Sequence, residues 1–300
     1  MSTVGLGCNN FGRRIDAQQT EKVVRAALDA GVTLFDTADV YGDGQSEELL
    51  GRALGERRDE AVIATKFGMQ MGDDPDRQGA SPEWIATAVE DSLRRLGTDR
   101  IDLYQVHRPD PEVPIEETLG ALGELVAAGK VVEIGCSNFT GAQIEEAEQV
   151  ADAAGLPRFV SAQNHWNLLE RTVEEDVIPA CRRHGLLVLP YFPLSSGVLT
   201  GKYELGEEPP EGTRLGSIPK DRAERFLNDE DLRTAAALEE FAEEREHSLL
   251  ELAISWLASD DVVASVIAGA TKPEQVEANA SAAGWHLTPE ERAEIDRITA

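Results

Sequence analysis

The chain has 300 residues, of which 56 are Asp or Glu and 28 are Lys or Arg, and its formal net charge is −28. A charge of this sign repels nucleic acids and anionic membranes, so the sequence excludes both as expected partners. The acidic residues are spread along the whole chain, as in a solvated surface, and adaptation to a salt-rich cytoplasm is one hypothesis for them. That hypothesis predicts better folding in molar salt.

Short apolar runs alternate with longer amphipathic stretches along the whole chain. In the first half, the runs TVGLG, TLFDT, AVIATKF and IDLYQVH precede expected helices at 16–30, 45–55, 82–96 and 115–129. In the second half, VVEIGCS, RFVSAQ, LLVLPY and VVASVIAG precede helices at 140–153 and 172–184, a long acidic helical region, and 273–282. Eight such units without a break in composition predict an α/β protein, a (β/α)8 TIM barrel that forms a single domain over residues 1–300.

One connection is too long for an ordinary turn. Residues 203–228 follow the seventh expected strand and are rich in Gly, Pro and charge. We interpret this segment as a lid or substrate loop, and the alternative is a solvated excursion without function.

The cysteines and the N-terminal residues bear on the compartment. Cys8, Cys136 and Cys181 are far apart and show no CxxC spacing, so we expect buried free thiols and neither a disulfide framework nor a metal site. The first residues, MSTVGLGCNN, lack the pattern of a signal peptide, and the longest apolar runs are too short to span a bilayer. The sequence therefore predicts a soluble, cytoplasmic protein.

Four polar residues lie on or just beyond three successive strands, where barrels of this kind build their chemistry. They are Asp36 and Tyr41 in FDTADVYG, Lys66 in ATKFG, and His107 in YQVHRPD. Taken singly, each has a plain alternative, such as a helix cap, a packed ring, a solvated lysine or a satisfied core histidine. Charges within apolar strands normally need a partner or a function, so their joint placement favours a common site.

This group is suited to the reduction of a carbonyl group, whose oxygen needs a proton donor. Tyr41 would supply the proton, and an ammonium beside it, from Lys66, would lower the phenol pKa from ~10 by roughly 1 to 3 units. Asp36 would hold Lys66 protonated and oriented, and His107 would hydrogen-bond the substrate oxygen.

At this point the residues resemble a known family. FDTADVYG, ATKFG, HRPD, GCSNF, the stretch from YFPL to LTGKY, and GATKPEQVEAN together look like an aldo-keto reductase, from about residue 4 to residue 283. By this resemblance Asp36, Tyr41, Lys66 and His107 occupy the catalytic tetrad of an NADP(H)-dependent enzyme that reduces aldehydes or ketones. Family members usually carry a hairpin before the first strand, whereas TVGLG is reached here by residue 3, so we expect a barrel without that cap.

No GxGxxG motif follows a strand, so a nicotinamide cofactor is expected on the barrel rim. The resemblance implies a carboxamide site at Ser137, Asn138 and Gln163, with Tyr191 stacked on the nicotinamide ring. It implies a pyrophosphate segment at Leu194, Ser196, Gly197, Leu199 and Lys202, and an adenosine end at Gly269, Thr271, Lys272, Gln275 and Asn279. Because Lys272 lies at a helix start, where dipole and cation act together on a 2′-phosphate, we expect NADP(H) in preference to NAD(H).

Two other functions stay open, together with the substrate. The chain is alternatively an NADP-binding regulatory or sensor subunit without significant turnover, or an enzyme that works in reverse on an alcohol or sugar. The expected partner is a small-molecule carbonyl or alcohol substrate. Its pocket would involve the 203–228 loop and residues among Asn9, Asn10, Phe11, Trp84 and Trp166. The other histidines, His165, His184, His247 and His286, show no metal-ligand spacing and are interpreted as surface or structural residues.

Overall fold

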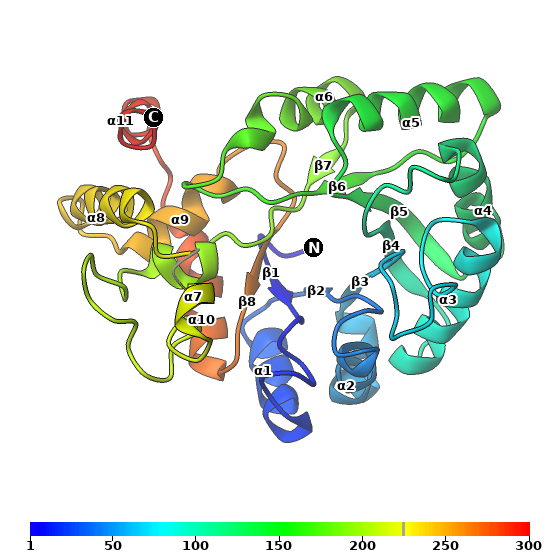
Figure 1. The fold of residues 1–300 in the computed structure, drawn as a ribbon, viewed down its shortest axis with the longest axis horizontal. Coiled ribbons are helices and arrows are strands. Elements are labelled where there is room, and N and C mark those ends of the chain that lie inside the picture. The colour runs from blue at the N-terminus through cyan, green and yellow to red at the C-terminus, as the bar shows by residue number, and fades with distance from the viewer. Residues whose placement is uncertain (224–225) are drawn as a thin grey trace.

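The computed structural model describes residues 1–223 and 226–300, and in them eight parallel strands form one sheet (Figure 1). The order of the strands is β7-β6-β5-β4-β3-β2-β1-β8. β1 (Val4–Gly7) is the first element, and no hairpin precedes it within residues 1–3. The others are β2 (Leu34–Asp36), β3 (Val62–Phe67), β4 (Ile101–Val106), β5 (Val131–Ser137), β6 (Ser161–Gln163), β7 (Leu187–Val188) and β8 (Val266–Gly269).

The sheet closes on itself because the segment around β7 pairs with the segment around β8. Parallel bridges join Val188 to Val263 and Tyr191 to Ile267, and the amide of Ile267 donates to the carbonyl of Pro190 at 2.9 Å. The (β/α)8 barrel predicted from the sequence is therefore confirmed. In the closed order, β4 is four strands away from β8 through β1, β2 and β3 and equally through β7, β6 and β5, so the two strands lie opposite each other.

Helices cover the outside of the strands, as Figure 1 shows for α1 to α6. Successive strands are connected by α1 (Ala17–Asp29), α2 (Gln45–Leu54), α3 (Pro82–Leu96), α4 (Ile115–Ala127), α5 (Gly141–Ala154) and α6 (Val177–His184). After β7 come α7 (Lys220–Ala223), α8 (Asp229–Glu243) and α9 (Leu249–Ala258), and after β8 come α10 (Pro273–Ser281) and α11 (Pro289–Ile298).

The expected helices agree with these bounds except at α6. The sequence predicts a helix over 172–184, whereas the structure has a 3-10 turn at Thr172–Glu174 and an α-helix only from Val177. The physical reason is Pro179, which has no N–H to donate and is tolerated only in the first turn of a helix. A helix that began at 172 would place this proline in its interior.

The inner faces of the helices are buried against the sheet, and this packing fixes the positions of the strand ends. In α3, for example, Ile85, Val89 and Leu96 are buried, and the N-terminus of the helix is capped by Ser81, whose hydroxyl accepts from the Trp84 amide at 3.2 Å.

The three cysteines are buried and free, as predicted. No helix within the described residues is long and apolar enough to cross a membrane.

Candidate active site

A buried ion pair joins the ends of β2 and β3. The Lys66 ammonium donates to both carboxylate oxygens of Asp36, at 2.8 and 2.7 Å, and to the carbonyl of Thr37 at 2.9 Å. Lys66 is 0% and Asp36 is 3% exposed. All three ammonium donors are therefore used, which fixes the position of the charge beneath the rim.

Tyr41 and His107 lie beside this pair. The Lys66 Nζ atom is 5.2 Å from the centroid of the Tyr41 ring, and the Tyr41 and His107 rings meet edge to face with centroids 5.8 Å apart. The structure thus brings together the four residues that the sequence singles out, because β2, β3 and β4 are neighbours in the sheet.

Burial and neighbouring charges together shift the pKa values of Lys66 and Tyr41. Burial lowers the pKa of Lys66, but the charges of Asp36 and Tyr41 outweigh it, and the net shift is upward. Burial also raises the pKa of Tyr41 by more than Lys66 lowers it. Lys66 thus lowers the Tyr41 pKa as expected, but burial outweighs this effect, the net shift is upward, and Tyr41 holds its proton at neutral pH.

His107 is neutral at physiological pH. Burial, followed by the charges of Lys66 and Arg108, lowers its pKa to about 3. An imidazole in this state carries one N–H donor and one acceptor nitrogen, so it is able to hydrogen-bond a neutral carbonyl oxygen.

The residues expected around a nicotinamide carboxamide are bonded to the tetrad. Gln163 donates through Nε2 to Asp36 Oδ1 at 2.8 Å, and Asn138 donates through Nδ2 to the His107 carbonyl at 2.9 Å. Ser137 donates to the Gln163 carbonyl, and the Tyr191 hydroxyl donates to Asn138 Oδ1, both at 2.8 Å. The amide groups are consequently oriented by the same network that holds the catalytic candidates.

One cavity of about 600 Å³ opens on this rim. It is lined by Asp36, Tyr41 and His107, while Lys66 lies behind Asp36. Of the expected cofactor residues, Leu199 and Lys272 do not line it. Leu199 is 0% exposed, and Lys272 is an exposed N-cap of α10. The other twelve do: Ser137, Asn138, Gln163, Tyr191, Leu194, Ser196, Gly197, Lys202, Gly269, Thr271, Gln275 and Asn279.

The segment after β7 has unusual backbone geometry where it lines the cavity. Phe192, Ser195 and Ser196 have φ values of 54°, 42° and 58°, in the left-handed region that non-glycine residues seldom occupy. Gly197 follows with φ 100°. Left-handed residues of this kind concentrate at ligand-binding sites, where surrounding structure enforces them.

Several residues that line the cavity were not predicted from the sequence. Arg14, Arg108 and Arg214 line the cavity, with Arg214 contributed by the 203–228 segment. Their one signal in the sequence is that they are basic residues in strand-end loops of a strongly acidic chain, which is too weak to single them out.

The aromatic candidates for the pocket are wrong, whereas Asn9 and Asn10 do line it. Phe11 is 0% exposed and belongs to the core, Trp84 is buried in α3, and Trp166 packs edge to face on Trp256. Large apolar rings gain most from complete burial, which takes them away from an open rim.

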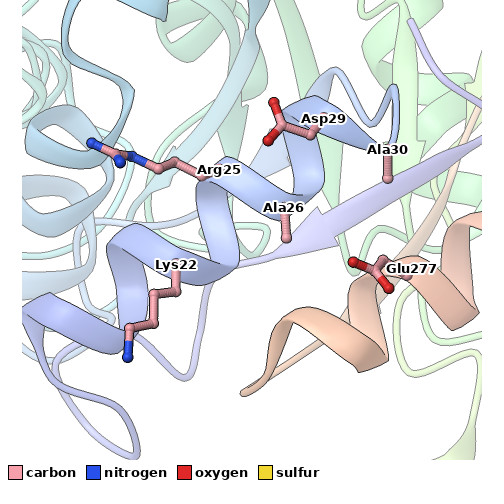
Figure 2. A pocket seen from close by; sticks show the side chains of 6 residues that line it. All are labelled: Lys22, Arg25, Ala26, Asp29, Ala30 and Glu277. Atoms are coloured by element: carbon pink, nitrogen blue, oxygen red, sulfur yellow. The ribbon is translucent and has the colours of Figure 1, made fainter.

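A second hollow lies elsewhere, between α1 and α10 (Figure 2). Its lining mixes Lys22 and Arg25 with Asp29 and Glu277 and shares no residue with the rim cavity. Arg25 pairs with Glu21, so this hollow is a groove in an ordinary charged surface.

A second buried charged cluster supports β3 from the side of α2 and α3. Glu47 is 0% exposed and accepts hydrogen bonds from Thr65 at 2.6 Å and from Arg95 at 2.7 Å. Asp39 is 1% exposed, and its Oδ2 has no hydrogen-bond partner among the described residues. Burial and the charge of Glu47 raise the pKa of Asp39 to about 8.

This pKa predicts how stability depends on pH. Native Asp39 keeps its proton up to about pH 8, whereas the unfolded chain releases it near pH 4, so this group makes the protein less stable as the pH rises between these values. Asp39→Asn abolishes that contribution. We expect the free energy of unfolding of Asp39→Asn, relative to the unmodified protein, to increase with pH up to about 8 in urea titrations.

The matched control is Asp43→Asn, because Asp43 is exposed and its left-handed backbone suits asparagine. Asp43→Asn should not reproduce the pH dependence expected of Asp39→Asn. A difference in unfolding free energy that stays constant with pH for Asp39→Asn would contradict the buried, protonated carboxyl.

The closed barrel, with a buried Lys–Asp pair beside a tyrosine and a histidine, defines an α/β-barrel protein with a candidate site at the C-terminal ends of its strands. The chain belongs to the Aldo/keto reductase family, whose sequence profile matches residues 3–300. The family that the motifs resemble is therefore confirmed.

Individual relatives cover nearly the whole chain. The aldo-keto reductase YhdN of Bacillus subtilis (strain 168) is 39% identical over 305 residues, which span 99% of this chain and 89% of the relative. A protein of Oryza sativa subsp. japonica, named a probable voltage-gated potassium channel subunit beta, is 38% identical over 296 residues, 97% of this chain and 89% of the relative. The structure of the glycerol dehydrogenase AKR11B4 from Gluconobacter oxydans matches with a TM-score of 0.84 and 35% identity, over 99% of this chain and 91% of that chain.

Proposed function

We propose that this protein is an NADP(H)-dependent oxidoreductase that reduces aldehydes or ketones to alcohols, with Tyr41 as the proton donor. The observation that carries the proposal is the contact of Tyr41 with both the buried Lys66–Asp36 pair and His107. The bound cofactor supplies the hydride that reaches the carbonyl carbon.

The roles of the four residues follow from their charge states. Tyr41 is protonated and gives its proton to the carbonyl oxygen as negative charge develops there. The Lys66 ammonium, held charged by Asp36, stabilises the phenolate that remains. Neutral His107 donates a hydrogen bond to the same oxygen and orients the carbonyl.

The residues of the rim fit a dinucleotide. The left-handed segment at 195–197 brings backbone close to the cavity, and Lys202 and Arg214 line it beside that segment. Small residues and cations of this kind suit a pyrophosphate. Gly212, Thr213 and Arg214 also line the cavity, which supports the 203–228 segment as a substrate or cofactor loop.

The test is a panel of aldehydes and ketones assayed with NADPH and NADH at low and high salt. Steady oxidation of NADPH is the expected result. The name of the rice relative favours the regulatory alternative, in which NADPH binds but turnover with every carbonyl is negligible. The name of the Gluconobacter protein favours the reverse direction, which alcohols assayed with NADP⁺ would reveal.

The choice of cofactor gives a further prediction, at Lys272. This exposed residue is the N-cap of α10, where a cation and the helix dipole together favour a 2′-phosphate. We expect Lys272→Glu to weaken NADPH binding about tenfold or more and to change NADH binding by less than about twofold. Fluorescence titration with each cofactor measures both constants.

Lys22→Glu is the control for the change in net charge, because Lys22 is an exposed residue of α1 (Figure 2) that does not line the rim cavity. It should leave both affinities as they are. Equal losses for NADPH and NADH in Lys272→Glu would argue against a 2′-phosphate contact.

A further inference from the structure

The rim cavity is positively charged although the protein is strongly acidic. Four cationic side chains line it, Arg14, Arg108, Lys202 and Arg214, and Asp36 is the one acidic residue of its described lining. Asp36 is neutralised by Lys66. In a chain with twice as many acidic as basic residues, such a lining favours an anionic ligand.

Three of the four cations lie on one side of the barrel. Arg14 follows β1, and Lys202 and Arg214 follow β7, while β7, β8 and β1 are adjacent in the closed sheet. Burial and the charge of Arg14 lower the pKa of both Lys202 and Arg214, so the three lie close enough to repel one another. This group therefore lies at the segments proposed to hold the cofactor phosphates.

Arg108 is on the other side, beside the catalytic candidates. It follows His107 at the end of β4, and β4 lies opposite β8. Its charge contributes to the lowered pKa of His107 and acts on Tyr191 as well. Because Arg108 lies across the rim from β8 and directly follows His107, it is the cation best placed for the molecule whose carbonyl meets Tyr41.

The backbone at Arg108 is held and its charge is not neutralised. The His107 amide donates to Phe67, and its carbonyl accepts from Asn138, while Pro109 restricts Arg108 to extended conformations. The nearest acid along the chain, Asp110, accepts from the amides of Ala80 and Glu112 at 2.8 and 2.9 Å. Arg108 forms no ion pair with any residue that the structure describes.

We propose that Arg108 determines substrate specificity and selects carbonyl compounds that carry an anionic group, a carboxylate or a phosphate, a few bonds from the reacting carbon. The proposal rests on the proposed function of the same site. A guanidinium recognises both anions through paired N–H donors, so the chemistry of recognition is the same for the two.

The experiment compares charged aldehydes with neutral aldehydes of the same carbon chain length. The pairs are 4-oxobutanoate against butanal and glycolaldehyde phosphate against glycolaldehyde, and the readout is the ratio of the two kcat/KM values within a pair. We expect the unmodified protein to prefer the charged member, and Arg108→Gln to lower that ratio about tenfold. Arg108→Lys should retain part of the preference, and Arg297→Gln, an exposed change in α11, should retain all of it.

The outcomes separate the two anions and the two proposals. A ratio that falls for one pair alone identifies a carboxylate or a phosphate as the recognised group, and an unchanged ratio in Arg108→Gln for both pairs overturns the inference. Calorimetry with 4-hydroxybutanoate and NADPH, a pair that cannot exchange a hydride, measures binding without turnover. Binding that depends on Arg108 in a protein inert toward all aldehydes would overturn the proposed function alone. If the protein shows neither binding of 4-hydroxybutanoate nor turnover of any aldehyde, both proposals are overturned.

Discussion

Tyr41→Phe is expected to reduce kcat for carbonyl reduction about 10³-fold, because general acid catalysis is worth roughly 10² to 10⁴. The substitution deletes the hydroxyl and keeps the ring that packs edge to face on His107. Binding of NADPH should therefore be unchanged. The measurements are steady-state rates with a good aldehyde and a fluorescence titration with NADPH.

A matched control is Tyr104→Phe. The Tyr104 hydroxyl is also buried, has no hydrogen-bond partner among the described residues, and belongs to a ring stacked on Phe67 outside the cavity lining. Its loss should leave the rate unaltered. If Tyr41→Phe kept more than about a tenth of the activity, a water or another side chain would have to donate the proton.

Lys66→Met should abolish activity and also destabilise the fold. It leaves the Asp36 carboxylate buried without its cation, and breaking a buried ion pair in this way costs about 3 to 5 kcal/mol. Urea unfolding of the purified variant measures this loss, and the NADPH assay measures the rate.

The double variant Asp36→Asn with Lys66→Met separates stability from catalysis. The amide introduced by Asp36→Asn carries no charge, and its oxygen remains able to accept the hydrogen bond from Gln163. The free energy of unfolding should recover in large part, while reduction stays absent because no cation faces Tyr41. A double variant as unstable as Lys66→Met would show that packing, and not the unpaired charge, causes the loss.

The positions of the catalytic candidates were predictable because they depend on local pattern. Asp36 and Lys66 interrupt apolar strands, and the strand ends of a barrel share one rim, so a common site follows from chain order and topology. The start of α6 was not predicted from periodicity, although Pro179 in the sequence carries the signal.

Residues that act through space were harder to predict. Arg14, Arg108 and Arg214 come from three separate loops, and no spacing in the chain relates them. Phe11 and Trp84 were expected near the pocket, but they are buried in the core instead, because burial of a large ring outweighs its proximity to the strand end.

The sequence by itself determined the alternation of strands and helices, the (β/α)8 class and the four polar residues at the strand ends. These follow from periodicity and composition within short segments, which a single chain displays directly. The tertiary structure decided the closure of the sheet, the cations that face the cavity and the net direction of the Tyr41 pKa. These depend on distances between remote segments and on how completely they exclude water, and both are defined only once the barrel has closed.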